Sequence, residues 1–75
     1  MDSEKVRSLA MSNFSSNFDD LRHLMAEYQK FHLLYDTSEG IEKEGYRMLM
    51  DVYKNKVLIQ IEAVNRNIQH LKVVF

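Results

Sequence analysis

The sequence predicts an all-α protein that folds as an antiparallel helical hairpin. Proline is absent, and the only two glycines, Gly40 and Gly45, lie close together. Residues 36–40 form the one stretch rich in turn-forming residue types. On both sides of this stretch apolar residues recur in steps of three and four, which places them on one face of an α-helix. One turn between two such stretches is typical of a helical hairpin.

The first sixteen residues carry the weakest pattern. Ser3 can cap a short helix with Val6 and Leu9 on one side, but an isolated helix of this length is unstable in water. We therefore expect residues 1–16 to form either a short docked helix or a flexible tail. Residues 12–17 are rich in Ser and Asn, whose side chains compete for backbone hydrogen bonds, and this composition predicts a break.

The first clear helix is predicted over residues 18–35. Asn17 is suited to cap it, and Asp19 and Asp20 in its first turn suit the positive end of the helix dipole. Its apolar face is broad, which indicates that more than one surface packs against it. The residues that follow the three-and-four step are Phe18, Leu21, Met25, Tyr28, His32 and Tyr35.

The turn precedes the second helix. Asp36 or Ser38 can cap this helix, and Gly40 can adopt the positive φ of a sharp reversal. Gly45 costs about 1 kcal/mol relative to Ala inside a helix. Either the regular helix begins near Tyr46, or Gly45 permits a close approach across the turn.

The second helix is predicted over residues 41–73 and organises the chain. Its apolar stripe comprises Tyr46, Met50, Tyr53, Val57, Ile61, Val64, Ile68, Leu71 and Phe75. Thirty residues at about 1.5 Å each span roughly 45 Å, whereas the predicted first helix spans roughly 27 Å. The C-terminal part of the long helix should therefore extend beyond its neighbour and leave apolar residues uncovered.

The apolar side of this long helix, with help from the first helix, is the predicted partner-binding site. The residues expected to carry it are Tyr53, Val57, Ile61, Val64, Ile68 and Leu71. A second apolar group on the same helix comprises Met48, Leu49, Val52, Leu58 and Ile59. Exposed apolar surface of this extent usually marks an interaction site, so we expect either another protein or a second copy of the chain to cover it.

Composition excludes several other classes. Seventy-five residues make one small domain, 1–75, whose own core is marginal. A net charge of −1 gives no basic face for nucleic acid. No stretch reaches the roughly 20 apolar residues of a membrane span, and the N-terminus lacks a signal-peptide pattern. A cytoplasmic location is the expectation.

The sequence offers no catalytic, cofactor or metal site. Cysteine is absent, so disulfides and thiolate zinc sites are excluded. His23 and Glu27, like His32 and Asp36, are four residues apart, a spacing that can place two ligands on one helical face. Pairs of polar residues commonly have this spacing in helical proteins, so we expect no metal site and no enzymatic activity.

The architecture resembles the small helical-hairpin co-chaperones of bacterial type III secretion needle subunits. The resemblance is carried by Glu39-Gly40 at the turn and Glu44-Gly45-Tyr46-Arg47 at the helix entry, with the apolar stripe through Val57, Ile61, Val64 and Ile68. It implies a bacterial cytoplasmic protein that pairs with a tetratricopeptide-type chaperone and keeps a needle subunit soluble. The Phe- and Tyr-rich first helix and the Ser/Asn-rich stretch before it differ from the family pattern.

Three functional hypotheses follow. The leading one is a non-enzymatic protein-binding module that docks by helix packing onto another protein. The alternative is a self-associating homodimer, a four-helix bundle with a structural or regulatory role. The third, disfavoured by the charge pattern, is a small nucleic-acid-associated regulator.

Overall fold

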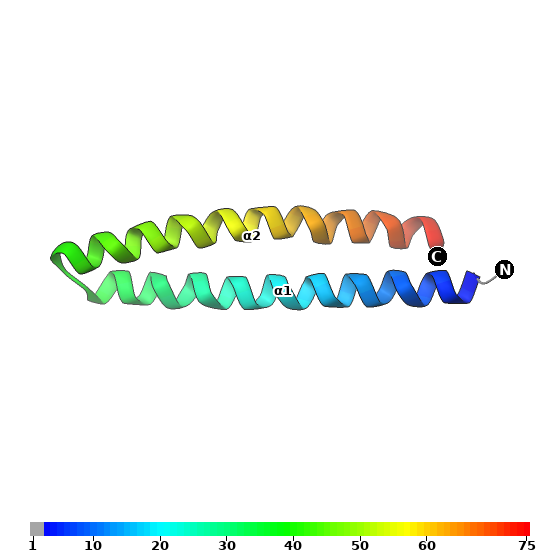
Figure 1. The fold of residues 1–75 in the computed structure, drawn as a ribbon, viewed down its shortest axis with the longest axis horizontal. Coiled ribbons are helices and arrows are strands. Elements are labelled where there is room, and N and C mark those ends of the chain that lie inside the picture. Colours follow the sequence, from blue (N-terminus) through cyan, green and yellow to red (C-terminus); the bar gives the residue numbers. More distant parts are fainter. Residues whose placement is uncertain (1–2) are drawn as a thin grey trace.

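The computed structural model describes residues 3–75, which form two helices packed side by side in opposite directions (Figure 1). Helix α1 comprises Ser3–Thr37 and helix α2 comprises Gly40–Val74, 35 residues each. The hairpin is narrow and elongated, with Cα extents of 61 × 14 × 12 Å. The predicted all-α antiparallel hairpin is confirmed.

The predicted start of the first helix, near residue 18, is wrong. Helix α1 begins at Ser3 and continues through the Ser/Asn-rich stretch 12–17 without a break. Its serines are exposed, and the side chain of Asn17 forms hydrogen bonds with α2 rather than capping a helix. Packing against a second helix has therefore outweighed the weak local helix preference of this stretch.

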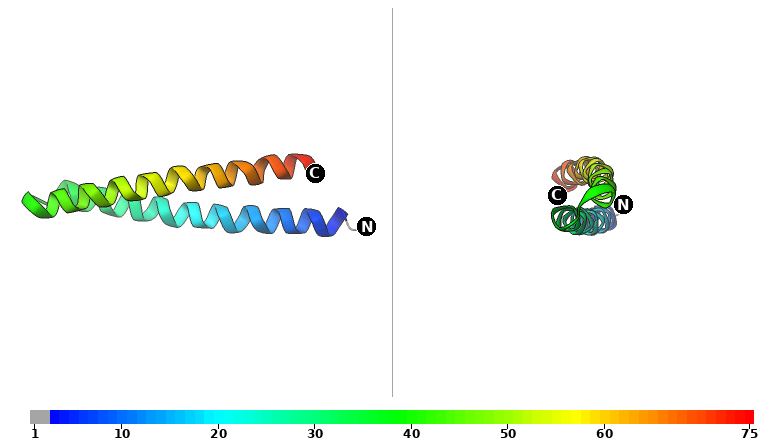
Figure 2. Two further views of the ribbon diagram at one scale, coloured as in Figure 1. Left: turned by 45° about the horizontal axis from the view of Figure 1, so that its top comes forward. Right: turned by 90° about the vertical axis from the view of Figure 1, so that its left-hand side faces the viewer.

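Because α1 is this long, α2 has no overhang. The start of α1 and the end of α2 lie at the same end of the hairpin, as Figures 1 and 2 show. Arg7 Nε donates a hydrogen bond of 2.8 Å to the carbonyl oxygen of Val74, and its guanidinium lies 5.7 Å from the ring centroid of Phe75. A cationic group suits the negative end of the α2 dipole, so this contact joins the two ends.

The turn between the helices is short. Gly40 has φ +68°, which confirms the predicted positive φ. Neither predicted cap residue caps α2: the Ser38 hydroxyl donates to the Leu34 carbonyl, and the Asp36 carboxylate lies 3.2 Å from His32 Nδ1. Glu39 occupies the cap position with an extended backbone and no side-chain hydrogen bond to the helix.

Gly45 fits neither predicted alternative. It lies inside α2, five residues after the helix begins, so the regular helix does not start near Tyr46. A Cβ atom added at Gly45 would have no neighbouring atom within 4 Å, so no close approach requires the glycine.

The two helices meet along a seam with the period of a coiled coil. The least exposed α2 residues along it are Tyr46, Met50, Tyr53, Val57, Gln60, Val64, Asn67, Leu71 and Val74. On α1 they are Ala10, Phe14, Asn17, Leu21, Leu24, Tyr28, Phe31 and Tyr35. The steps alternate between three and four, so these residues occupy positions a and d of a seven-residue repeat. Of these residues only Ala10 and Val64 are buried, and the others are half-buried.

Candidate protein-docking surface

Three polar residues cross the middle of the seam. Asn17 Nδ2 donates a hydrogen bond of 2.6 Å to Asn67 Oδ1, and Gln60 Nε2 donates one of 2.8 Å to the backbone oxygen of Asn17. Polar residues at seam positions are a device that sets helix register at some cost in stability. Here they hold Asn17 level with the middle of the α2 segment between Gln60 and Asn67.

The apolar stripes predicted from the sequence only partly coincide with this seam. On α1 the structure uses Asn17 and Leu24 where the prediction has Phe18 and Met25. On α2 it uses Gln60 and Asn67 where the prediction has Ile61 and Ile68, and it uses Val74 rather than Phe75. The displaced apolar residues lie one position beyond the seam, at the e positions that follow each d position.

These displaced residues gather on one side of the hairpin. In an antiparallel pair of helices the e positions of both helices border the same edge of the seam. We call the resulting surface the Phe18–Ile61 face. It comprises Met11, Phe18 and Met25 of α1 with Leu58, Ile61 and Ile68 of α2.

Five of the six side chains of the Phe18–Ile61 face are exposed, and Ile68 is half-buried. The exposed fractions are 43% for Phe18, 53% for Met25 and 51% for Leu58. The Phe18 ring stacks on the ring of Phe14, a seam residue, with a centroid separation of 5.7 Å. This contact holds the Phe18 ring in place while part of it remains exposed to solvent. Large apolar side chains held this open form a surface that a partner can cover.

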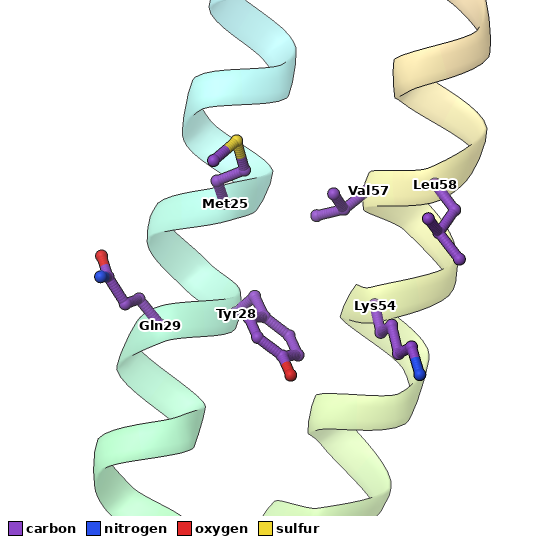
Figure 3. Close-up of a pocket in the computed structure, with 6 residues that line it drawn as sticks. All are labelled: Met25, Tyr28, Gln29, Lys54, Val57 and Leu58. Atoms are coloured by element: carbon purple, nitrogen blue, oxygen red, sulfur yellow. The ribbon is translucent and has the colours of Figure 1, made fainter.

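A shallow groove of about 320 Å³ lies at the turn-proximal end of this face (Figure 3). Figure 3 shows Tyr28 of α1 and Val57 of α2 pointing into the space between the helices. The other lining residues are Met25, Gln29, Lys54 and Leu58. The groove therefore places Met25 and Leu58, from different helices, on the same side of the hairpin.

The six predicted partner-binding residues divide into two groups. Tyr53, Val57, Val64 and Leu71 lie in the seam; Val64 is buried, and the Tyr53 ring centroid is 5.3 Å from that of Phe31. Ile61 and Ile68 lie on the Phe18–Ile61 face, with Ile61 37% exposed.

The α1 half of this face was not predicted as a binding surface. Met11 lay in the segment predicted as either a short docked helix or a flexible tail, and Phe18 and Met25 were expected to cover α2 rather than to border it. The sequence feature that indicates this half of the face is the seven-residue spacing of these three apolar residues, which places them on one side of a helix.

The second predicted apolar group is not one patch. Leu58 belongs to the Phe18–Ile61 face, whereas Val52 and Ile59 occupy c positions near the opposite edge of the seam. Met48 points outward, away from both edges, by the same register. Leu49, at a g position, borders the same edge as Val52 and Ile59.

The Phe18–Ile61 face carries few charged residues, and Lys54 lies at the groove at its turn-proximal end. Among the e positions and the adjacent b positions of residues 11–28 and 57–71, Arg22 is the one charged residue. Its guanidinium forms an ion pair of 3.7 Å with Asp19. A neutral apolar face suits packing against another apolar surface and offers little attraction to phosphate.

Charged groups concentrate instead near the turn. Arg47 donates hydrogen bonds to the Glu44 carboxylate and lies 3.3 Å from Asp51 Oδ2. The hydrogen bond from Arg47 lowers the pKa of Glu44, and the same bond raises the pKa of Arg47. Within residues 3–75 no three His, Asp or Glu side chains are grouped so as to hold a metal ion.

Comparison with known proteins gives no relative: no protein-family model, no curated protein and no solved structure matches the chain. Neither helix in the described part of the chain is long and apolar enough to cross a membrane.

Proposed function

We propose that the chain is a non-enzymatic protein-binding module that docks helix-on-helix through the Phe18–Ile61 face. The observation that carries this proposal is the position of Phe18, Met25 and Ile61. These large apolar side chains come from both helices, lie on one edge of the seam and remain exposed.

The small core of the hairpin supports the same function. Among residues 3–75, Ala10 and Val64 are the only apolar residues that are buried. A chain of this size usually gains stability from a metal, from disulfides or from a partner, and the sequence has no cysteine. Covering the Phe18–Ile61 face with further helices would bury apolar area where the hairpin alone leaves it open.

The experiment is site-specific photo-crosslinking in cells that express the chain. A photoreactive phenylalanine replaces Phe18 or Ile61, and the control carries it at Leu33, which is 65% exposed on the outer side of α1. We expect positions 18 and 61 to form adducts with a protein, whatever the identity of that protein. We expect no adduct from position 33. Equal labelling at all three positions, or none at 18 and 61, contradicts the proposal.

A cytoplasmic secretion co-chaperone is a more specific version of this function. Its support is the hairpin architecture with an apolar face left open for a helical client or chaperone. This version predicts that a tetratricopeptide-type chaperone and a needle-type subunit appear among the adducts at positions 18 and 61. Adducts that contain neither would limit the proposal to the general binding function.

A further inference from the structure

We propose that a second copy of the chain covers the Phe18–Ile61 face, which gives an antiparallel four-helix bundle. Its two-fold axis lies in the interface, perpendicular to the helices, at the level of Phe18 and Val64. This inference rests on the proposed function, because it names the occupant of the same face.

The apolar rows of both helices point toward one side of the hairpin. In the N-terminal half of α1 and the C-terminal half of α2, the continuous apolar row runs along positions a and e. The d positions there include Asn17, Gln60 and Asn67. An apolar row through positions a and e is rotated by roughly 50° about the helix axis, relative to a row through positions a and d. Both helices thus direct their apolar rows toward the same side, as helices do when they face the centre of a four-helix bundle.

The apolar row of α1 is symmetric about one residue. Phe18 lies at its centre, with Met11 seven residues before it and Met25 seven residues after it. Between them, Phe14 and Leu21 flank Phe18 at similar distances. A two-fold axis at Phe18 would place Met11 opposite Met25 of the second copy, so apolar residues meet apolar residues along the whole row.

The α2 row has the same symmetry about Val64. Ile61 and Ile68 lie on its two sides, and Val57 and Leu71 each lie seven residues away from it. An axis at Val64 would place Ile61 opposite Ile68 of the second copy.

The two centres lie at the same level of the hairpin. The hydrogen bonds of Asn17 to Asn67 and from Gln60 hold Asn17 opposite the middle of the segment 60–67, where Val64 lies. Phe18 follows Asn17 directly. One axis therefore serves both rows, which is the condition for an interface in which the same patch meets itself.

The charges agree with a second copy packed in this orientation. The centre of the face carries no net acidic or basic cluster that would repel its own image. Fourteen residues from Phe18 in either direction, the α1 row ends at Glu4 and His32. The antiparallel arrangement places Glu4 across from His32 of the second copy, whose Nδ1 faces Asp36 of its own chain, and not across from a second Glu4.

The first test is sedimentation equilibrium of the full chain over a wide concentration range. We expect a dimer of about 18 kDa, twice the 8.9 kDa of one chain. Phe18→Asp should raise the dissociation constant at least about 100-fold, because a carboxylate would be buried at the axis. The control Leu33→Asp makes the same kind of change on the outer side and should leave the dissociation constant unchanged.

The second test fixes the orientation. The chain has no cysteine, so single cysteines can be introduced at Met11 and Met25 and joined with a short bis-maleimide. The antiparallel bundle predicts cross-linking when Met11→Cys and Met25→Cys chains are mixed, and little when either is alone. Efficient cross-linking of Met11→Cys to itself would indicate parallel copies and would overturn the two-fold arrangement.

The outcomes separate this inference from the function on which it rests. A chain that is monomeric up to about 1 mM, or a dimer that is unaffected by Phe18→Asp, overturns the second-copy proposal. If photo-crosslinks from position 18 then contain a different protein, the binding function stands with another occupant. If they contain no protein, both proposals fail.

Discussion

Asn17 and Asn67 face each other across the hairpin, with 2.6 Å between Nδ2 of the first and Oδ1 of the second. The pair sits in the seam where apolar residues usually lie, and Gln60 completes its hydrogen bonding through the Asn17 backbone oxygen. In an alternative register of the two helices, these side-chain amides would lack their hydrogen-bond partners. Burying an unpaired amide costs more free energy than a mismatch between apolar side chains. The pair therefore favours the one alignment that puts Phe18 level with Val64.

A double-mutant cycle should show that this pair is coupled. We expect Asn17→Ala and Asn67→Ala each to lower the free energy of unfolding, with a coupling of about 1 kcal/mol, because either single change leaves an amide without its partner. Urea unfolding followed by helical circular dichroism measures the four free energies at one protein concentration. Additive effects would show that the hydrogen bond contributes no net stability.

Gly45 should be a site where the chain can be stabilised. It lies within α2, and a Cβ atom there would meet open space. Gly45→Ala should raise the free energy of unfolding by about 1 kcal/mol, since alanine loses less backbone entropy in a helix. The measurement is the urea midpoint, and an unchanged or lower midpoint would contradict the expectation.

Gly40 should respond in the opposite direction to the same substitution. Its φ of +68° is a conformation in which an L side chain is strained, although no atom occupies the space. Gly40→Ala should lower the free energy of unfolding by about 1 kcal/mol. Gly40→Asn is the control, because asparagine tolerates this conformation better than alanine and should recover part of the loss. Equal stability of the Ala and Asn variants would count against a conformational cause.

Part of the fold follows from hydrophobic periodicity alone. From Tyr46 to Val57 the seam residues are apolar, so the predicted stripe and the packed seam are the same. Beyond Val57 the predicted stripe and the packed seam differ at some positions. Periodicity assigns Gln60 and Asn67 to the surface, because it does not include their hydrogen bonds with Asn17. For the same reason the stretch 12–17 reads as a break when it is taken without its neighbour.

Hydrophobic periodicity also predicts the α2 part of the candidate site, but not its α1 part. Ile61 and Ile68 belong to an apolar row visible in the sequence, and the prediction included them. The structure shows that Val64 of the same row faces α1, which no pattern within one helix could reveal. Phe18 was recognised as apolar, but its position at the edge of the seam depends on the register set by Asn17.

The charge cluster near the turn should give a small, defined pH dependence. Arg47 lowers the pKa of Glu44 from its usual 4.5 in the folded chain. A depressed folded pKa contributes stability that is present above the unfolded value and is lost as pH falls through the folded one. The contribution should therefore be full at neutral pH and be lost in acid, as the pH falls through the lowered pKa of Glu44.

The test compares wild type with Glu44→Gln by urea midpoint as a function of pH. The difference between the two should be small at neutral pH, since the pair is exposed, and should vanish in acid. Glu62→Gln is the matched control, an exposed carboxylate on the same helix with no ion pair within residues 3–75. A Glu44→Gln effect that is constant with pH would rule out the ionic origin.

Ile61 and Val64 should separate docking from hairpin stability, although they lie three residues apart on one helix. Val64 is buried against α1, so Val64→Asp places a carboxylate in the seam and should lower the unfolding midpoint at every protein concentration. Ile61 lies on the exposed face, so Ile61→Asp should mainly abolish the rise of the midpoint with concentration that accompanies self-association.

Measuring the midpoint of each variant over about a hundredfold range of concentration distinguishes these effects. Ile61→Ala serves as the control for the added charge and should weaken the concentration dependence without abolishing it. If Ile61→Asp instead destabilised the chain as much as Val64→Asp at the lowest concentration, Ile61 would belong to the hairpin core. The Phe18–Ile61 face would then lose its central residue on α2, and with it the distinction between seam and docking surface.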